Sequence, residues 1–343
     1  MWTVEWGFQL FTRVETESQV GWGQSLPSSG NFSAPYLSLI QRISPAIIGE
    51  NEEDVKKLWK KMFRLLFTGG YGITTSSISS IDIALWDIIS RKRGLNLSEV
   101  LGGEKKAIKR YASLARYRRE SDLTNIVRNL VDEGFKLVKL HQEAGRTLSA
   151  MKAIRESIGY SADIAIDLNS SLDLDSTVNF FNQIIRYEPK WIEEPLWPPD
   201  DYKSLRKLNQ IAPVACGENV FSYFEFERLV ESDSVSYLQP DVSKVGGITA
   251  ALDIFHMLSK NKIGLMPHCR PDNGWLTAVV TAEILGALGI DSIVETPPNS
   301  IPTEYLKFEG SINSLEIHPT GTGIGLEPIS PFPIQEVPPP LNF

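Results

Sequence analysis

The chain has few of the residues that build disulfide scaffolds or thiolate metal sites. Only two cysteines, Cys216 and Cys269, occur among its 343 residues, together with four histidines. Two cysteines cannot form a disulfide framework or a zinc site by themselves, so we expect free thiols and a reducing compartment. Because histidine is so scarce, a histidine at the end of a predicted strand is informative.

The sequence also lacks signals for membrane insertion and secretion. Its longest apolar run, residues 277–290, is interrupted by Glu283 and is too short to cross a bilayer. Residues 1–10 contain Glu5 and no basic segment, which makes a poor signal peptide. We therefore expect a cytoplasmic protein.

Positive charge is scarce relative to negative charge. The chain has 34 Lys and Arg against 42 Asp and Glu, a formal net charge of −8 and a pI near 5.2. This balance argues against nucleic acid or an anionic membrane as a partner, because both require concentrated Lys and Arg. Two small basic clusters are predicted to be solvated faces: Lys105, Lys106, Lys109 and Arg110, and Arg116, Arg118 and Arg119.

The first third of the sequence predicts a small α+β unit over residues 1–106. Apolar residues make up 42% of the chain, enough for a core in one large or two smaller domains. Residues 2–24 contain two alternating apolar and polar runs, which predict an antiparallel strand pair. Helical patterns follow at residues 51–67 and 76–94, and a Gly-Gly pair then ends the segment.

From Lys109 onward, a strand followed by a helix recurs, and this rhythm predicts a (β/α) barrel over residues 107–311. The eight expected strands are 109–115, 135–141, 163–169, 191–195, 213–218, 236–241, 263–268 and 292–296. After them the chain is rich in Pro and Gly. We expect residues 312–343 to form an extended tail that packs on the first unit.

Acidic and basic residues recur near the ends of these strands. In order they are Lys139, His141, Asp167, Glu193, Glu218, Asp241, His268 and Glu295. From Asp167 onward, one member lies at or near each strand end, and successive members are 23 to 27 residues apart. This interval is about the length of one strand, one helix and two short loops. Since the carboxyl ends of barrel strands meet at one mouth, these side chains are expected to converge there.

Three carboxylates, Asp167, Glu193 and Glu218, are expected on consecutive strands. They cannot all stay ionised in a partly dry cleft without a cation, because like charges raise each other's pKa. Mg²⁺ resolves this conflict, since it takes oxygen ligands and keeps positions open for water or substrate. For any one of them, a helix N-cap after the strand is the alternative, but regular placement on three strands weakens it for the set.

Two candidate groups carry the acid and base chemistry. Lys139 and His141 are two residues apart on a strand and so share a face, where they need an anionic partner; an exposed edge strand is the alternative. Asp241 and His268 end neighbouring strands, so the carboxylate can orient the imidazole. Glu295, at the last strand end, either stabilises charge on a substrate oxygen or has only a structural role as a cap.

Two further features have a weaker signal. Asn169 shares its predicted strand face with Asp167, where it could contact substrate or water. The glycine pair Gly246 and Gly247 resembles a phosphate cradle between strand and helix, but tight helix packing is the better explanation.

In their order and spacing, these motifs resemble the enolase superfamily, and within it the mandelate racemase subgroup. The motifs are SSISSIDIALWDIISRKRGLNLSEVLGG, DLNSS, WIEEP, CGENV, QPDVSKVGGIT, the PH of LMPH, and VET. The resemblance implies an α/β fold: a modified (β/α)₇β TIM-like barrel capped by an N-terminal α+β domain. It also implies Mg²⁺-dependent removal of the proton α to a carboxylate through an ene-diolate.

The resemblance implies a role for each site residue. Asp167, Glu193 and Glu218 would bind Mg²⁺. His268, paired with Asp241, would be acid or base on one face, and Lys139 and Glu295 would contact the substrate carboxylate. The subgroup typically has Lys-x-Lys on the second strand, whereas this chain has Lys139 and His141, so His141 takes the place of the opposite base. Two imidazoles suit dehydration, which needs one base and one acid.

Three functions remain open. Dehydration of an acid sugar to a 2-keto-3-deoxy acid is the leading hypothesis, because the segment 21–30 resembles the specificity loop and its Ser, Gly and Gln suit a polyhydroxylated ligand. A racemase or epimerase of a 2-hydroxy acid is second, and a metal-stabilised binding protein without activity is third. The expected partner is a small-molecule carboxylate, and barrels of this class often form homo-oligomers.

Overall fold

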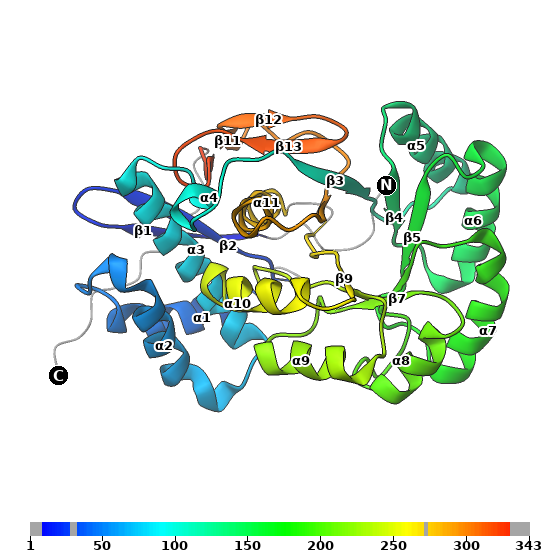
Figure 1. Cartoon of the computed structure of the whole chain (residues 1–343), viewed down its shortest axis with the longest axis horizontal. Helices are drawn as coiled ribbons and strands as arrows, with labels where there is room; N and C mark the ends of the chain where they lie inside the picture. Colours follow the sequence, from blue (N-terminus) through cyan, green and yellow to red (C-terminus); the bar gives the residue numbers. More distant parts are fainter. Residues whose placement is uncertain (1–8, 28–32, 271–273, 330–343) are drawn as a thin grey trace.

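An N-terminal capping unit packs beside a barrel of parallel strands. The computed structural model describes residues 9–27, 33–270 and 274–329. In Figure 1 the capping unit lies at the left, and the helices of the barrel form its outer layer at the right. The predicted fold class is confirmed. No helix in the described ranges is long and apolar enough to cross a membrane.

The capping unit combines one strand pair with a group of helices. Strands β1 (Leu10–Glu15) and β2 (Val20–Ser25) pair antiparallel, as the alternating pattern predicted, with Leu10 opposite Ser25. The helices are α1 (Ser33–Ile43), α2 (Val55–Leu66), α3 (Ile73–Arg93) and α4 (Leu97–Val100), with 3-10 turns at Ser44–Ala46, Glu52–Asp54 and Phe67–Gly69. Helix α1 was not predicted from the sequence.

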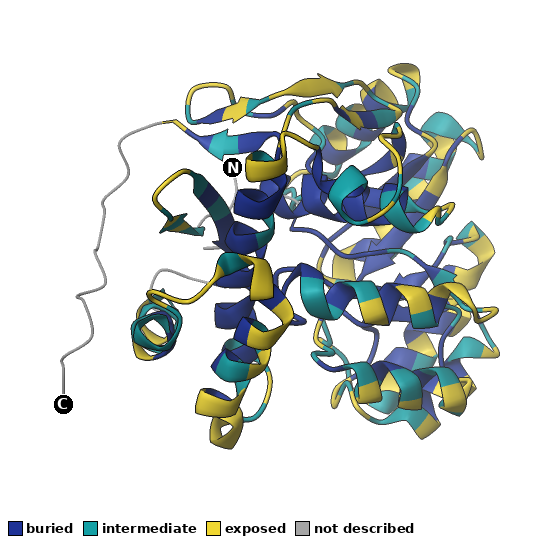
Figure 2. Cartoon of the chain, turned by 60° about the vertical axis from the view of Figure 1, so that its left-hand side comes forward, coloured by how far each residue is buried: buried dark blue, intermediate teal, exposed yellow. Residues whose placement is uncertain are grey.

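Helix α3 forms the centre of the capping unit and is buried along most of its length. Its apolar residues pack against α1 and α2, and its small serines leave room for β2. A Cβ atom at Gly23 would lie 1.8 Å from the Ser80 carbonyl oxygen, so only glycine allows this approach. Figure 2 colours the interior elements dark blue and the outward faces of the peripheral helices yellow.

The barrel consists of eight parallel strands, all of them at predicted positions. They are β3 (Ile108–Ser113), β4 (Leu137–Leu140), β5 (Asp163–Asp167), β6 (Ile192–Glu193), β7 (Val214–Cys216), β8 (Tyr237–Leu238), β9 (Gly264–Leu265) and β10 (Ile293–Thr296). Strands β3 to β9 pair in sequence order, and β10 pairs with β3.

Seven helices connect these strands and cover the outside of the barrel in the described part of the chain. They are α5 (Glu120–Asp132), α6 (Ala144–Ile158), α7 (Leu174–Ile184), α8 (Tyr202–Asn209), α9 (Tyr223–Ser232), α10 (Ile248–Ser259) and α11 (Trp275–Leu288), with a 3-10 turn at Ile185–Tyr187 after α7. A large apolar core lies between the strands and this layer.

The inside of the barrel is built in two layers. The lower layer is apolar and contains Tyr111, Leu137, Ala165, Trp191, Ala215, Tyr237, Met266 and Ile293. Side chains two residues apart on a strand share a face, so the residues two positions further along form the layer above. This upper layer contains Ser113, Lys139, Asp167, Glu193, Gly217, Gln239, His268 and Glu295. Most of the candidate site therefore rests on an apolar floor.

Short strands follow β10, in a region where the sequence predicted no further strand and, from residue 312, only a tail. They are β11 (Leu306–Phe308), β12 (Gly310–Ile312), β13 (Glu316–Pro319) and β14 (Leu326–Pro328). Strand β13 pairs antiparallel with β3 of the barrel, and the Leu97 amide donates to the Gly323 carbonyl (3.0 Å), so this segment touches both units. The terminal PPPLNF lies outside the described residues.

One basic residue predicted to be solvated is instead buried. The guanidinium of Arg110 donates to Thr296 Oγ1 (2.9 Å) and to the Pro297 carbonyl (2.8 Å), and it lies over the ring of Phe135 (4.9 Å). The prediction was wrong because a cluster of basic residues in the sequence does not indicate that backbone carbonyl oxygens will surround Arg110 in the fold.

The loop between β8 and α10 attaches the barrel to α2 and α3 of the capping unit. Trp59 Nε1 donates to the Gly246 carbonyl (2.7 Å), and the Gly246 amide donates to Ser79 Oγ (2.9 Å). A Cβ atom at Gly247 would lie 2.5 Å from Asp82 Oδ2, and both glycines have positive φ. Tight packing is therefore the confirmed reason for the glycine pair.

Asp82 of α3 lies at the N-terminus of α10 and gives a prediction about stability. Its carboxylate accepts from Thr249 N (2.9 Å) and Thr249 Oγ1 (2.6 Å), but burial raises its pKa from the ordinary value of 3.8 to about 7. Between pH 4 and 7, the Asp82 carboxyl therefore keeps its proton in the folded state but has lost it in the unfolded state. Asp82 thus lowers the free energy of unfolding as pH rises through this window, by at most about 1.4 kcal/mol per pH unit.

The substitution Asp82→Asn should remove this dependence, because the amide does not titrate. We expect the melting temperature of the variant to fall less than that of the wild type between pH 5 and 7, as measured by circular dichroism. Asp132→Asn changes an exposed carboxyl on α5 and is the matched control. Parallel curves for wild type and Asp82→Asn would contradict the prediction.

Candidate active site

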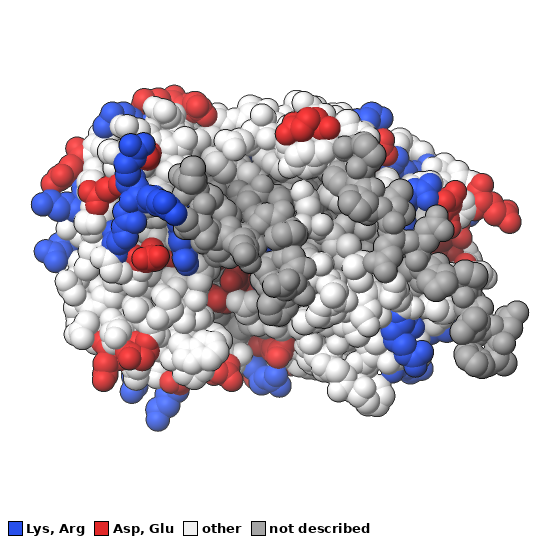
Figure 3. Space-filling view, turned by 180° about the vertical axis from the view of Figure 1, so that it is seen from behind, with Lys and Arg blue, Asp and Glu red and all other residues white. Residues whose placement is uncertain are grey.

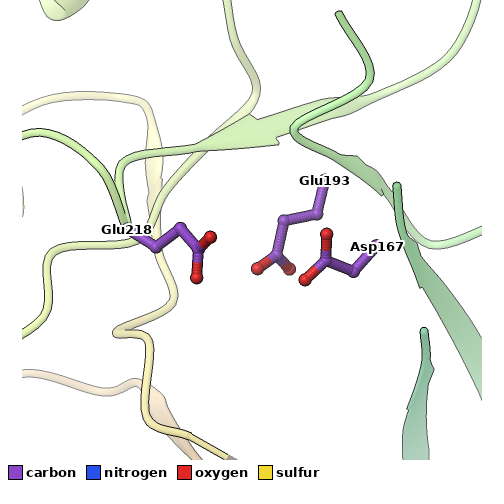
Figure 4. A group of neighbouring side chains, drawn as sticks. All are labelled: Asp167, Glu193 and Glu218. Atoms are coloured by element: carbon purple, nitrogen blue, oxygen red, sulfur yellow. The ribbon is translucent and has the colours of Figure 1, made fainter. Parts of the chain in front are cut away.

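Three buried carboxylates meet at the mouth of the barrel. Asp167, Glu193 and Glu218 follow one another on β5, β6 and the end of β7, and one oxygen from each lies within 4.8 Å of the others. Figure 4 shows the three side chains pointing toward a common space. Gly217, with φ of 134°, redirects the chain after β7 so that Glu218 reaches the group. The predicted convergence of these residues is confirmed.

Lys139 lies at the base of this group and is fully buried. Its Nζ is 2.8 Å from Glu193 Oε1, 2.8 Å from Glu295 Oε1 and 3.8 Å from Asp167 Oδ2. Although burial opposes the charged form, Glu193 and Glu295 raise the pKa of Lys139 well above its ordinary value. The ammonium is therefore a fixed positive charge between two carboxylates, and the exposed-edge alternative for β4 is wrong.

His268 lies between two carboxylates at the end of β9. Nδ1 is 2.7 Å from Asp241 Oδ2, and Nε2 is 2.7 Å from Glu218 Oε2. Burial lowers the pKa of His268, but Glu218 and Asp241 outweigh it and raise the pKa to about 10. Because both ring nitrogens face acceptors, the imidazole carries two protons and is cationic. The predicted pairing of Asp241 with His268 is confirmed.

His141 has a different hydrogen-bonding environment from His268. Nδ1 lies 2.6 Å from the Leu114 carbonyl oxygen, which can only accept, so Nδ1 carries a proton. Nε2 faces the carboxylate group and is 3.1 Å from Asp167 Oδ2. The two histidines therefore stand at opposite ends of the row of carboxylates, His141 beside Asp167 and His268 beside Glu218.

Glu295 is held at the inner edge of the site. Oε1 pairs with Lys139, and Oε2 accepts from Tyr111 Oη and from the Cys269 amide, both at 3.2 Å. Both cysteines are free thiols, as predicted, and both are buried. The carboxylate of Glu295 thus lies next to the lysine that shares its predicted role.

Asn169 does not follow the strand geometry on which its prediction depended. Strand β5 ends at Asp167, and Asn169 adopts a left-handed conformation with φ of 44°. Its backbone N–H donates to Asp167 Oδ1 (2.8 Å), and its side-chain Oδ1 accepts from Arg116 (3.3 Å). Arg116 also donates to the His141 carbonyl (2.8 Å) and is not simply a solvated residue. Contact between Asn169 and a substrate stays a prediction.

The residues present fit a divalent cation. Burial, together with Asp167, Glu295 and Glu218, raises the pKa of Glu193 to about 7 even though Lys139 opposes the shift. The cluster without a cation thus tends to take up a proton, the conflict that a hard metal ion removes. All three donors are carboxylate oxygens, the ligands that such cations prefer.

A second row of polar residues supports these carboxylates and was not predicted. Glu194 is buried, and Asn219 Nδ2 donates to it (2.9 Å) and to Glu218 Oε1 (3.0 Å). Burial and then Glu218 raise the pKa of Glu194 well above its ordinary value. Lys244 Nζ lies 3.4 Å from Asn219 Oδ1 and 3.9 Å from Glu218 Oε2. The second Glu of WIEEP was the available sequence signal.

Two uncharged members of the upper layer were also missed. Ser113 and Gln239 are fully buried at the ends of β3 and β8, and neither has a charge that draws attention in the sequence. Counting two residues past each lower-layer position would have found both. Gln239 Nε2 donates to Glu193 Oε2 at 2.6 Å.

The segment that resembled a specificity loop is only partly a loop. Residues 20–25 form β2, and residues 28–32 lie outside the described part. Between them, the Pro27 carbonyl accepts from Arg270, two residues after His268, at 2.8 Å. This segment therefore reaches the barrel beside a candidate catalytic residue. On the face shown in Figure 3, acidic side chains lie both near the middle and along the edges, and Lys and Arg lie mainly toward the edges.

Comparison with known families agrees with this geometry. Residues 3–102 match the model for the mandelate racemase / muconate lactonizing enzyme N-terminal domain, and residues 122–330 match the enolase C-terminal domain-like model. The chain belongs to the mandelate racemase and muconate lactonizing enzyme family. The family resemblance inferred from the motifs is therefore confirmed.

Individual members of the family are similar over most of the chain. A D-galactonate dehydratase of Ralstonia pickettii is 31% identical over 76% of this chain and 71% of its own length. The structure of the 3,6-anhydro-D-galactonate cycloisomerase from Zobellia galactanivorans is 25% identical, with a TM-score of 0.83 over 93% of this chain and 91% of that one. A Streptomyces coelicolor racemase with bound magnesium is 22% identical and has the same fold (TM-score 0.83, 93% and 89% covered).

Proposed function

We propose that this family member is a Mg²⁺-dependent dehydratase of a sugar acid, with D-galactonate the first substrate to test. The observation that carries the proposal is a pair of histidines at opposite ends of the carboxylate row, each with Nε2 directed at one of the three carboxylates. His268 lies between Asp241 and Glu218, and His141 lies between the Leu114 carbonyl and Asp167. Dehydration needs one acid and one base.

Asp167, Glu193 and Glu218 would hold the Mg²⁺ ion, since they are the three buried carboxylates that converge. When bound, Mg²⁺ withdraws charge from a substrate carboxylate and so makes the α-proton more acidic. Lys139 adds a fixed positive charge, and Glu295 keeps that ammonium in place. A substrate carboxylate is thus drawn to the inner end of the site.

His141 is assigned as the base. Its Nδ1 proton is held by the Leu114 carbonyl, so the ring cannot turn, and Nε2 is the atom available to take the α-proton. Arg116 bonds the His141 carbonyl and stabilises the backbone at this point. Histidine is the side chain that most often serves as a general base.

His268 is assigned as the acid. Asp241 holds Nδ1 and keeps the imidazolium form stable. Nε2 can therefore donate a proton to the β-hydroxyl group, which then leaves as water. Ser243 in turn donates its hydroxyl and amide to Asp241 Oδ1, both at 2.7 Å, which fixes the carboxylate. The proton taken at Cα and the hydroxyl lost at Cβ leave an enol that becomes the 2-keto-3-deoxy acid.

A racemase or epimerase is the second candidate function. The same two histidines face the site from different strands, as a two-base reaction requires. Racemisation needs bases matched in strength, whereas the Nδ1 partner is the Asp241 carboxylate for His268 and the Leu114 backbone carbonyl for His141. The geometry therefore favours dehydration.

The test is proton NMR in D₂O with Mg²⁺ and a panel of sugar acids and 2-hydroxy acids, D-galactonate among them. A 2-keto-3-deoxy product supports the proposal, and α-proton exchange without that product supports the epimerase. If no compound of the panel reacts although Mg²⁺ raises the melting temperature of the protein, the inactive binding protein is the remaining hypothesis. The proposal also includes a cytoplasmic homo-oligomer that acts on a free small molecule and binds no nucleic acid.

A further inference from the structure

Gln239 stands in the upper layer of the barrel among the candidate catalytic residues. It directly follows β8 and lies two residues after Tyr237 of the lower layer, so its side chain points into the barrel. The neighbouring strands, β7 and β9, lead to Glu218 and His268. The side chain is fully buried, yet it carries both hydrogen-bond donors and an acceptor.

The amide nitrogen of Gln239 holds one oxygen of Glu193. Nε2 donates to Glu193 Oε2 at 2.6 Å, and Trp191 Nε1 donates to the same oxygen at 3.1 Å. A carboxylate can only accept, so the nitrogen of the amide must face it. The two donors fix the rotation of the carboxylate, whose Oε1 pairs with Lys139.

The amide oxygen of Gln239, in contrast, has no hydrogen-bond partner in the described part of the chain. Oε1 is buried and accepts no hydrogen bond from any group in the described ranges of the chain. Buried polar atoms in native proteins are nearly always paired. In a site that binds a hydroxylated ligand, an acceptor of this kind is completed by a donor on the ligand, and an analogue without that donor is rejected.

We propose that Gln239 performs both tasks: its N–H positions Glu193 for metal binding, and its carbonyl oxygen accepts a hydrogen bond from a hydroxyl group of the bound sugar acid. The second task rests on the proposed function, because a polyhydroxylated substrate supplies the O–H. Gln239 is thus a positioning residue for Glu193 and a specificity residue for the substrate.

The first task is tested by Mg²⁺ binding alone. Gln239→Met keeps an unbranched side chain of similar length without the amide, and Trp191→Phe is the companion variant that removes only the other donor to Glu193 Oε2. Isothermal titration should show that each variant binds Mg²⁺ about 10-fold or more weakly than the wild type. Wild-type affinity in a folded Gln239→Met protein would overturn the positioning role.

The second task is tested by steady-state kinetics with D-galactonate and its monodeoxy analogues at saturating Mg²⁺. Wild type and Trp191→Phe should both prefer D-galactonate over one particular analogue, and Gln239→Met should lose that preference about 10-fold or more, mainly through KM. An equal loss with every analogue would overturn the hydroxyl contact.

The two proposals fail in distinguishable ways. If the wild type binds Mg²⁺ but does not act on D-galactonate, the proposed substrate is wrong, and the hydroxyl contact fails with it for that compound. The titrations still decide whether Gln239 positions Glu193, because they need no substrate. Circular dichroism of each variant ensures that the comparison is between folded proteins.

Discussion

Glu193→Gln is expected to abolish Mg²⁺ binding and catalysis together. Glu193 is the central ligand candidate, with Oε1 beside Lys139 and Oε2 held by Trp191 and Gln239. An amide in its place puts an NH₂ group against either the ammonium or the two N–H donors, and it removes a negative charge from the metal site. Because the loss of a residue that only supports a ligand weakens binding 10- to 100-fold, the loss of the ligand should exceed about 100-fold.

Isothermal titration with Mg²⁺ measures this change directly, and thermal melts give a second readout. Mg²⁺ should raise the melting temperature of the wild type, because it binds only the folded state, and should leave that of Glu193→Gln unchanged. Glu231→Gln removes an exposed carboxylate from α9 and is the control for lost charge. Normal Mg²⁺ affinity in Glu193→Gln would refute the ligand assignment.

The two histidine variants should fail at different steps. In His268→Asn, the acid is lost, so dehydration should fall by about 10² to 10⁴, while the substrate α-proton still exchanges in D₂O. In His141→Asn, the base is lost, so exchange and dehydration should both fall by a similar factor. Mg²⁺ binding should weaken less in both variants than in Glu193→Gln, because each histidine contacts a proposed ligand but is not itself a ligand.

Proton NMR of substrate and product in D₂O separates these outcomes in one experiment. Asp241→Asn is the companion variant, because it leaves the His268 ring in place but removes the carboxylate that stabilises its cation. It should resemble His268→Asn. If His141→Asn exchanged the α-proton at the wild-type rate while His268→Asn did not, the assignment of acid and base would be reversed.

The charged part of the site was predictable because the barrel repeats. One strand, one helix and two loops take similar lengths, so residues such as Asp167 and Glu193 recur at strand ends with a regular interval. Like charges that must converge in a buried place also require a counterion, which the sequence alone implies. The same argument predicted an anionic partner for Lys139 in the carboxylate group, which Glu193 provides, whereas its contact with Glu295 was not predicted.

The remaining parts depend on contacts that no local pattern records. Ser113 and Gln239 are neutral, and only their place above the apolar floor identifies them. Asn169 left the expected face because β5 ends two residues earlier and the chain then turns with positive φ. Strands β11 to β14 are too short for a periodic signal, and β13 forms only because β3 offers an edge.

The attachment of α3 to the loop before α10 has a consequence for protein engineering. Ser79 of the capping unit bonds Gly246 in the loop that bears Asp241, Asp82 bonds Thr249 in the first turn of α10, and Gly247 has no side chain because Asp82 fills that space. The two units are therefore not interchangeable modules. A chimera that joins the capping unit of one relative to the barrel of another would have to transfer residues 79–82 and 246–249 as a matched set, or misplace the carboxylate behind His268.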